Sequence, residues 1–212
     1  MPRIICRRGE LTADLGADFR DVATGAAPKQ ATHVWCAWDA EELRVLIRAE
    51  DTHIHATLTG RDAPLYTEEV VEVFLDPTGD GAAYFEIEVN PLNAVLDLVL
   101  RRNRSGYRKD FEWHCENLRT QVRREAAAWS AELAIPFASI TAEPPRTGDK
   151  WRVNFTRIDR PPEIPRELTA WSPTGLANFH VPERFGVMEF SGEHARPERL
   201  VLASRRDEVW KP

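Results

Sequence analysis

The sequence predicts an antiparallel β-sandwich or jelly roll built as one domain. Apolar and polar residues alternate in many short segments, as half-buried strands require, and no segment has the spacing of a long amphipathic helix. Turn-forming residues separate these segments, as at 76–81, where glycine permits a positive φ. Many short strands at regular spacing, punctuated by turns, are typical of sandwiches.

Eight segments show the strand pattern. Residues 43–49 alternate cleanly, residues 70–75 are apolar except for Glu72, and residues 84–89 alternate again. The prolines of Asn90-Pro91 and Pro144-Pro145 interrupt pairing because proline lacks the ladder donor. A short helical turn is expected near 136–140. The predicted strands are 43–49, 70–75, 84–89, 95–100, 118–123, 128–135, 151–158 and 186–190.

The length and composition fit a single globular domain. The chain has 212 residues, of which 42% are hydrophobic and 29% charged, enough to bury a core. We expect the domain to span 1–192. Residues 193–212 are charged and are expected to form a C-terminal extension packed by Trp210.

The net charge and the lack of long apolar runs argue against two classes of partner. The formal net charge is −6, whereas a general nucleic-acid binder needs a basic face to neutralise phosphates. A locally basic segment is expected to be a solvated loop. No apolar run approaches the roughly 18 residues that span a bilayer, so no membrane is expected as a partner. The basic residues are Arg101, Arg102, Arg104, Arg108 and Lys109.

The cysteines and the N-terminus favour a reducing compartment. Cys6, Cys36 and Cys115 form no CxxC pair, and an odd number permits at most one disulfide. The first ten residues lack the apolar core of a secretory signal. We therefore expect a cytoplasmic protein, or a secreted one if a leader has been removed.

A polar face runs along two neighbouring predicted strands. Glu72 lies on one strand, and Tyr84, Glu86, Glu88 and Asn90 lie at alternate positions of the next, so all should share a side of the sheet. A polar outer face is ordinary for an antiparallel sheet. Neighbouring carboxylates nevertheless repel one another unless sugar hydroxyls, a cation or arginines offset them. Both a binding face and a solvated face remain open. The opposite, core side is expected to be Val71, Val73, Leu75, Phe85, Ile87 and Val89.

Two aromatic residues lie in predicted loops. Tyr66 precedes the 70–75 strand, and Trp171 lies in a Ser/Thr/Pro-containing segment. Sugar rings present C–H groups that stack on aromatic faces, and loop aromatics often bind ligands. The alternative is that each covers one end of the sandwich. The remaining tryptophans are expected in the core, apart from Trp210.

A calcium site is a weaker prediction. Asp76 and Asp80 flank glycines in a turn, and hard cations prefer oxygen ligands. The full loop signature is missing, so a plain hairpin is favoured over a structural calcium site. His53 and His55 alone are too few ligands to indicate zinc.

Enzymatic signatures are missing from the sequence. There is no GxSxG, HExxH, phosphate-binding loop or dinucleotide motif. Paired carboxylates such as Glu72 and Glu88 could serve glycoside hydrolysis, but that reaction also needs a deep cleft that nothing in the sequence specifies.

Several blocks together resemble carbohydrate-binding module family 9. They are the run from Arg61 to Pro77, then Tyr84-Phe85-Glu86-Ile87-Glu88-Val89-Asn90-Pro91, then 129–137, 148–155, and finally Trp171 with Arg184-Phe185-Gly186. The similarity extends over roughly 31–190. It implies a β-sandwich of the jelly-roll type that clamps a sugar between two aromatic side chains. Family members can also hold structural calcium, which would here involve Asp76 and Asp80.

The resemblance also implies site residues. Trp171 falls where one clamp tryptophan would be, and Tyr66 replaces the other. Glu72 and Asn90 match residues that contact sugar hydroxyls. Glu88 stands where an arginine is expected, a departure that bears on which sugar is bound.

We therefore predict non-catalytic binding of a mono- or oligosaccharide, with Arg157 as a further contact. Such modules usually accompany glycosidases in polysaccharide catabolism. Two alternatives stay open. One is a haem-binding relative with Met188 or a histidine as ligand, and the other is a glycoside-acting enzyme using Glu72, Glu86 or Glu88.

Overall fold

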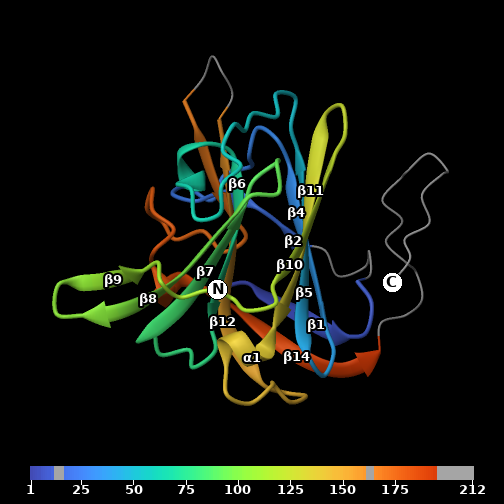
Figure 1. The fold of residues 1–212 in the computed structure, drawn as a ribbon, viewed down its shortest axis with the longest axis vertical. Helices are drawn as coiled ribbons and strands as arrows, with labels where there is room; N and C mark the ends of the chain where they lie inside the picture. Colours follow the sequence, from blue (N-terminus) through green and yellow to red (C-terminus); the bar gives the residue numbers. More distant parts are fainter. Residues whose placement is uncertain (12–16, 161–164, 195–212) are drawn as a thin grey trace.

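The computed structural model describes residues 1–11, 17–160 and 165–194, and it is almost entirely β-structure (Figure 1). The helical elements within these ranges are the single turn α1 (Phe137–Ile140) and two 3-10 turns, η2 (Leu65–Thr67) and η3 (Pro182–Arg184). The all-β prediction is confirmed, as is the short helical turn near 136–140. Trp210 and most of the predicted C-terminal extension lie outside the described residues.

Every predicted strand is present, usually longer by one to three residues. The structure adds strands at 3–8, 32–38, 106–110 and 167–170 that the alternation did not reveal. The strands are β1 (Arg3–Arg8), β2 (Ala17–Asp18), β3 (Arg20–Asp21), β4 (Thr32–Trp38), β5 (Glu42–Glu50), β6 (Val70–Asp76), β7 (Ala83–Val89), β8 (Val95–Asn103), β9 (Gly106–Asp110), β10 (Arg119–Arg124), β11 (Ala128–Pro136), β12 (Lys150–Asp159), β13 (Glu167–Ala170) and β14 (Gly186–His194).

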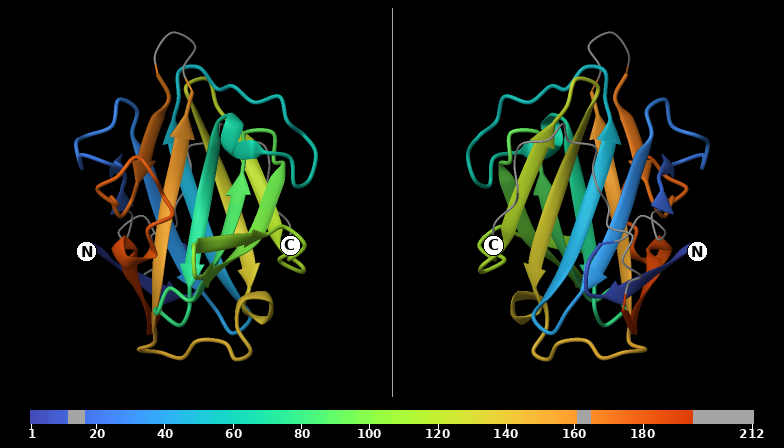
Figure 2. Two further views of the ribbon diagram at one scale, coloured as in Figure 1. Left: turned by 90° about the vertical axis from the view of Figure 1, so that its left-hand side faces the viewer. Right: turned by 90° about the vertical axis from the view of Figure 1, so that its right-hand side faces the viewer.

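The strands form two facing layers that are continuous at one side (Figure 2). The hydrogen-bonded order is β10-β11-β5-β4-β1-β14-β12-β6-β7-β8-β9. Strands β10, β11, β5 and β4 make one layer, and β12, β6, β7 and β8 make the other. Strands β1 and β14 connect the two layers.

The sheet is mixed, so the prediction of a wholly antiparallel sheet is wrong at β1. This strand pairs in parallel with β14, where Ile4 lies opposite Met188, and in parallel with β4, where Arg7 lies opposite Ala37. Parallel neighbours need long connections, and β1 is far along the chain from both partners. The remaining pairings are antiparallel.

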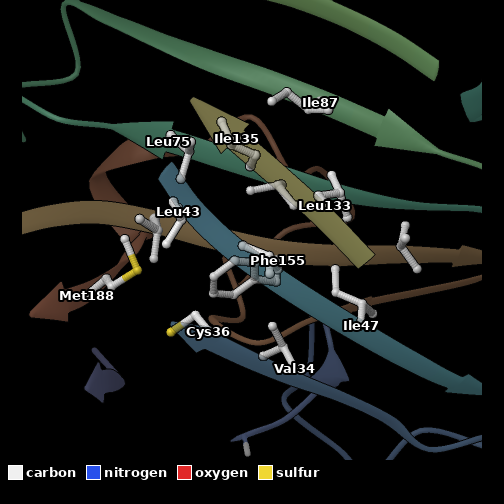
Figure 3. Close-up of a cluster of buried hydrophobic side chains, with 14 of the residues drawn as sticks. Val34, Cys36, Leu43, Ile47, Leu75, Ile87, Leu133, Ile135, Phe155 and Met188 are labelled. Atoms are coloured by element: carbon white, nitrogen blue, oxygen red, sulfur yellow. The ribbon is translucent and has the colours of Figure 1, made fainter. Parts of the chain in front are cut away.

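The main core fills the space between the layers (Figure 3). Leu43 and Ile47 of β5 and Leu133 of β11 face Leu75 of β6 and Ile87 of β7. The predicted core side of β6 and β7 is therefore confirmed. Cys6, Cys36 and Cys115 are buried free thiols.

A second apolar cluster lies on the outer face of the β12-β6-β7-β8 layer. Phe74, Leu96 and Leu98 from this face pack with Leu65 of η2 and with Phe185. This face is therefore covered by chain segments rather than open to water. The predicted basic loop is instead a β8–β9 hairpin, whose arginines are exposed as expected.

Among the described residues, no helix has the length and apolar character needed to cross a membrane.

Candidate functional site

Three glutamates of β6 and β7 meet on the outer face of their layer. Glu72 pairs directly with Glu88, and Glu86 lies opposite Phe74. Side chains two positions apart share a face of a strand, so the sequence alternation brings all three together, as predicted. Unlike an ordinary polar face, this one is covered, and the three side chains are 2%, 2% and 1% exposed. We call Glu72, Glu86 and Glu88 the glutamate triad.

The triad has very few hydrogen-bond donors. One carboxyl oxygen of each residue lies within 4.8 Å of the others. The Thr156 hydroxyl donates to Oε2 of Glu72 at 2.5 Å. Oε2 of Glu86 and both oxygens of Glu88 are buried and receive no donor, and Glu88 can bond to Glu86 only while a proton lies between them. A buried carboxylate without donors is costly, so the triad is poised for an added partner.

Burial raises the pKa values of the triad. The pKa of Glu72 is raised to about 8, first by burial and then by the charge of Glu86. The pKa of Glu88 lies well above its ordinary value, first because of burial and then because of the charges of Glu72 and Glu86, and the pKa of Glu86 is raised by burial. Near neutral pH the triad therefore holds protons that a cation or a better donor could displace.

A pocket of about 170 Å³ opens above the triad. Glu72 and Glu86 line it, together with residues from η2, β9, β12, β13 and the segment before η3. Its other lining residues are Tyr66, Lys109, Ile158, Arg166, Leu168, Ala177, Asn178, Phe179 and His180. The pocket thus combines an acidic floor with aromatic and cationic walls.

Two aromatic rings line this pocket. Tyr66 is 42% exposed, and Nζ of Lys109 lies 5.8 Å from its ring centroid. Phe179 packs against Phe74 at a centroid distance of 6.5 Å. Tyr66 was predicted from sequence, whereas Phe179 was not. The same signal, an aromatic residue in a Gly/Pro/Ser-containing loop, could have found it.

His180 is a neutral wall of the pocket. Burial, followed by the charge of Lys109, lowers its pKa to about 4. Its Nδ1 lies 3.1 Å from the hydroxyl of Tyr84. The imidazole therefore adds no positive charge near the triad at neutral pH.

Trp171, the other predicted stacking residue, is buried in the main core. It is 5% exposed, and its ring centroid lies 5.7 Å from that of Phe155. The ring fits closely over Gly186, where a Cβ would lie 2.3 Å from it. This packing explains the Trp and Gly of the sequence pattern, but it leaves no ring face open to a ligand.

Asn90 and Arg157 also lie away from the pocket wall. Asn90 is buried, donates to the carbonyl of Leu58 and accepts from the amides of Leu92 and Ala94, so it orders the β7–β8 turn. It is 0% exposed and does not line the pocket where its contact with sugar hydroxyls was predicted. Arg157 belongs to a different cluster.

That cluster is a second group of three buried acids. Asp51, Glu69 and Asp159 bring carboxyl oxygens within 4.8 Å of one another. The guanidinium of Arg157 lies 3.1 Å from Asp51 and 3.4 Å from Asp159, and it donates to the carbonyl of Glu50 at 2.8 Å. We call these three acids the arginine-paired triad. Arg157 acts as their counter-ion.

Asp76 and Asp80 shape the β6–β7 hairpin. Asp76 accepts from the amides of Gly79 and Gly81, and Asp80 accepts from that of Ala82. Neither belongs to a group of three potential metal ligands in the described part of the chain. These contacts fit the plain hairpin that the sequence favoured.

Met188, the sulfur ligand of the haem alternative, is buried in the main core (Figure 3). It does not line the pocket above the triad. A larger hollow of about 450 Å³ lies at the other end of β6, between Pro77 and Trp151. No buried polar side chain lines it, so it offers no comparable chemistry.

An all-β domain with a ligand-sized pocket on one sheet face belongs to the class of small-molecule binding modules. Residues 17–193 match the family model of carbohydrate family 9 binding domain-like proteins, and the chain belongs to this family.

Solved structures share the fold at low sequence identity. A Bacteroides uniformis protein, whose carbohydrate binding is itself an inference, is 17% identical with a TM-score of 0.71, over 89% of this chain and 99% of that one. A family 9 module of Caldicellulosiruptor kristjanssonii in complex with cellotriose is 16% identical, with a TM-score of 0.68, over 97% and 100%. A family 9 module of the same organism in complex with glucose is 17% identical, with a TM-score of 0.66, over 92% of this chain and 98% of that one. No curated protein gives a significant match.

Proposed function

We propose that this chain is a non-catalytic carbohydrate-binding domain that takes a sugar in the pocket above the glutamate triad. The observation that supports this most directly is the combination of aromatic rings and buried carboxyl groups in one ligand-sized pocket. Family membership and the sugar complexes of the Caldicellulosiruptor modules support the same function. The proposal includes the finer fold description, a β-sandwich of the jelly-roll type.

The walls and floor suit different parts of a sugar. The exposed ring of Tyr66 offers an apolar face to sugar C–H groups, and Phe179, which is 7% exposed, lines the pocket beside it with the part of its ring that stays uncovered. Carboxyl groups of Glu72 and Glu86 line the floor, where they can accept from hydroxyls or, when protonated, donate to them.

The electrostatics favour binding over hydrolysis. A glycosidase needs two carboxyl groups whose pKa values are pushed apart, one ionised and one protonated. In the triad all three pKa values are raised, because all three groups are buried together. Burial thus shifts the three pKa values in the same direction, which supports binding over hydrolysis.

The first test is calorimetric titration of the protein with glucose and cellotriose, using wild type, Tyr66→Ala and Tyr66→Phe. Losing the ring should weaken binding about tenfold, since aromatic contacts are worth about 0.5–1.5 kcal/mol beyond buried area. Tyr66→Phe should retain binding. Phe111→Ala is the matched control, because Phe111 is similarly exposed and does not line the pocket.

Two results would count against the proposal. If neither sugar gives a saturable signal, sugar binding is wrong. If a chromogenic glycoside is turned over and Glu86→Gln abolishes that turnover, the enzymatic alternative is favoured.

A further inference from the structure

The glutamate triad contains more carboxyl groups than the neighbouring cationic side chains could neutralise if all three were ionised. Nothing donates to Glu88 as a carboxylate, although it is 1% exposed and directed at the other two carboxyl groups. In the described part of the chain, no ion pair joins a cationic side chain to any of the three. A sugar with hydroxyls alone supplies no counter-ion that would allow these groups to give up their protons.

The cations nearby lie on the wall rather than in the cluster. Lys109 and Arg166 line the pocket, and both are exposed. Lys109 is close enough to favour ionisation of all three glutamates, but forms no contact within ion-pair distance. With the triad fully ionised and His180 neutral, three negative charges face two positive ones. One further positive charge would balance the pocket.

We infer that the pocket selects a sugar carrying a primary ammonium group, an amino sugar, whose ammonium is held by the lining residues Glu72 and Glu86, with the buried Glu88 beside them as the third acid. This inference rests on the proposed function and specifies its ligand. An ammonium has three donors, and the triad presents three carboxyl groups whose oxygens lie within 4.8 Å of one another. Hydrogen bonds between charged groups are also the strong ones.

A metal ion fits the same oxygens less well. Calcium takes about six to eight oxygen ligands, often including backbone carbonyls. Here the floor is a paired sheet whose carbonyls belong to the ladder, and the neighbours of Glu88 and Glu86 on β8 are Leu96 and Leu98. The donor count therefore favours an ammonium over a divalent cation.

Binding of an ammonium should release protons. The triad by itself holds protons near neutral pH, whereas holding a cation requires it to ionise. The other groups facing it are Lys109, Arg166, His180 and the Tyr84 hydroxyl. Neither ring titrates near neutral pH, because burial lowers the pKa of His180 to about 4 and raises that of Tyr84 above its usual range. Affinity should therefore rise from pH 5.5 to 7, as the triad ionises more easily.

The experiment is calorimetric titration at pH 7 with four probes: glucosamine, glucose, N-acetylglucosamine and glucuronic acid. Glucosamine should bind at least about tenfold more tightly than glucose, since hydrogen bonds to charged groups exceed neutral ones by that order. N-acetylglucosamine, which has the nitrogen without the charge, should gain nothing. Repeating the titration in two buffers of different ionisation enthalpy should reveal protons released only with glucosamine.

The matched variants are Glu88→Gln and Glu69→Gln. Glu88→Gln keeps the shape but removes a charge, so it should reduce the preference for glucosamine over glucose towards one. Glu69→Gln makes the same change in the arginine-paired triad, outside the pocket, and should leave the preference unchanged. Thermal unfolding of each variant establishes that it is folded, and the proton release of the wild type tests the inference without any variant.

The outcomes separate the two proposals. Equal binding of glucose and glucosamine, or a preference for glucuronic acid, would overturn the amino-sugar inference while sugar binding stands. Glucosamine binding that needs added calcium would also overturn it, in favour of a metal-bridged site. No binding of any of the four sugars would overturn the proposed function, and the inference with it.

Discussion

Two groups of three acidic side chains are buried in this domain, and they differ in one respect. The arginine-paired triad of Asp51, Glu69 and Asp159 includes a buried cation, because Arg157 of β12 reaches two of its members. The glutamate triad on the other face of the same layer has none, and only exposed cations lie near it.

The difference indicates different roles. A buried charge that is already paired contributes to the fold, whereas a buried acid cluster without donors is expensive and is typical of ligand sites. The two faces of β12 show how this arises. Thr156 faces the glutamate triad, and Arg157, one residue further along the strand, faces the opposite side.

The largest expected effect is the loss of Arg157. Arg157→Met should lower the free energy of unfolding by about 3–5 kcal/mol, because it leaves Asp51 and Asp159 buried without their counter-ion. Urea unfolding at pH 7 measures this change. A loss below about 1 kcal/mol would mean that the pairing of Arg157 with these acids does not stabilise the fold.

The pH dependence of stability should separate the triads next. A raised pKa in the folded state means that the native protein binds that proton more tightly, so the contribution of Glu72 and of Glu69 to stability is fully present below about pH 4.5 and is lost as pH rises towards 8. The fall amounts to about 1.4 kcal/mol per pH unit for each proton.

Urea unfolding between pH 5 and 8 checks this dependence in Glu88→Gln and Glu69→Gln. Glu88→Gln should flatten the fall more, because the glutamate triad has no buried cation. The cluster of Glu69, whose pKa is raised to about 8, contains the buried Arg157. If both variants reduce the pH dependence of the free energy of unfolding equally, the buried cation makes no difference to the electrostatics of the two triads.

The smallest expected effect is that of Lys109→Met. Lys109 is exposed, so its removal should change the free energy of unfolding by no more than about 0.5 kcal/mol. Comparison with Arg157→Met under the same conditions tests whether the burial of a cation, rather than its charge alone, decides how much it contributes to the free energy of unfolding. A loss comparable to that of Arg157→Met would contradict this interpretation.

Much of the site could be predicted from the sequence, because strand alternation is a local property. The shared face of Glu72, Glu86 and Glu88 follows from spacing and from the short 76–81 connection, which fixes the register. Tyr66 was found as an exposed loop aromatic. Trp171 has the same loop signature, yet it lies in the core, because Gly186 leaves room for its ring. The space for the Trp171 ring is therefore set by a glycine fifteen positions further along the chain, which local spacing does not reveal.

The sequence by itself determined the all-β class, the positions of the central strands and the side of the sheet on which each acid lies, because these depend on residues within a few positions of one another. The tertiary structure decided which acids acquire a cation, which aromatic ring stays exposed, and that the segment with Phe179 and His180 would cover the glutamate face. Those outcomes depend on contacts between residues far apart in the chain, where local spacing has no influence.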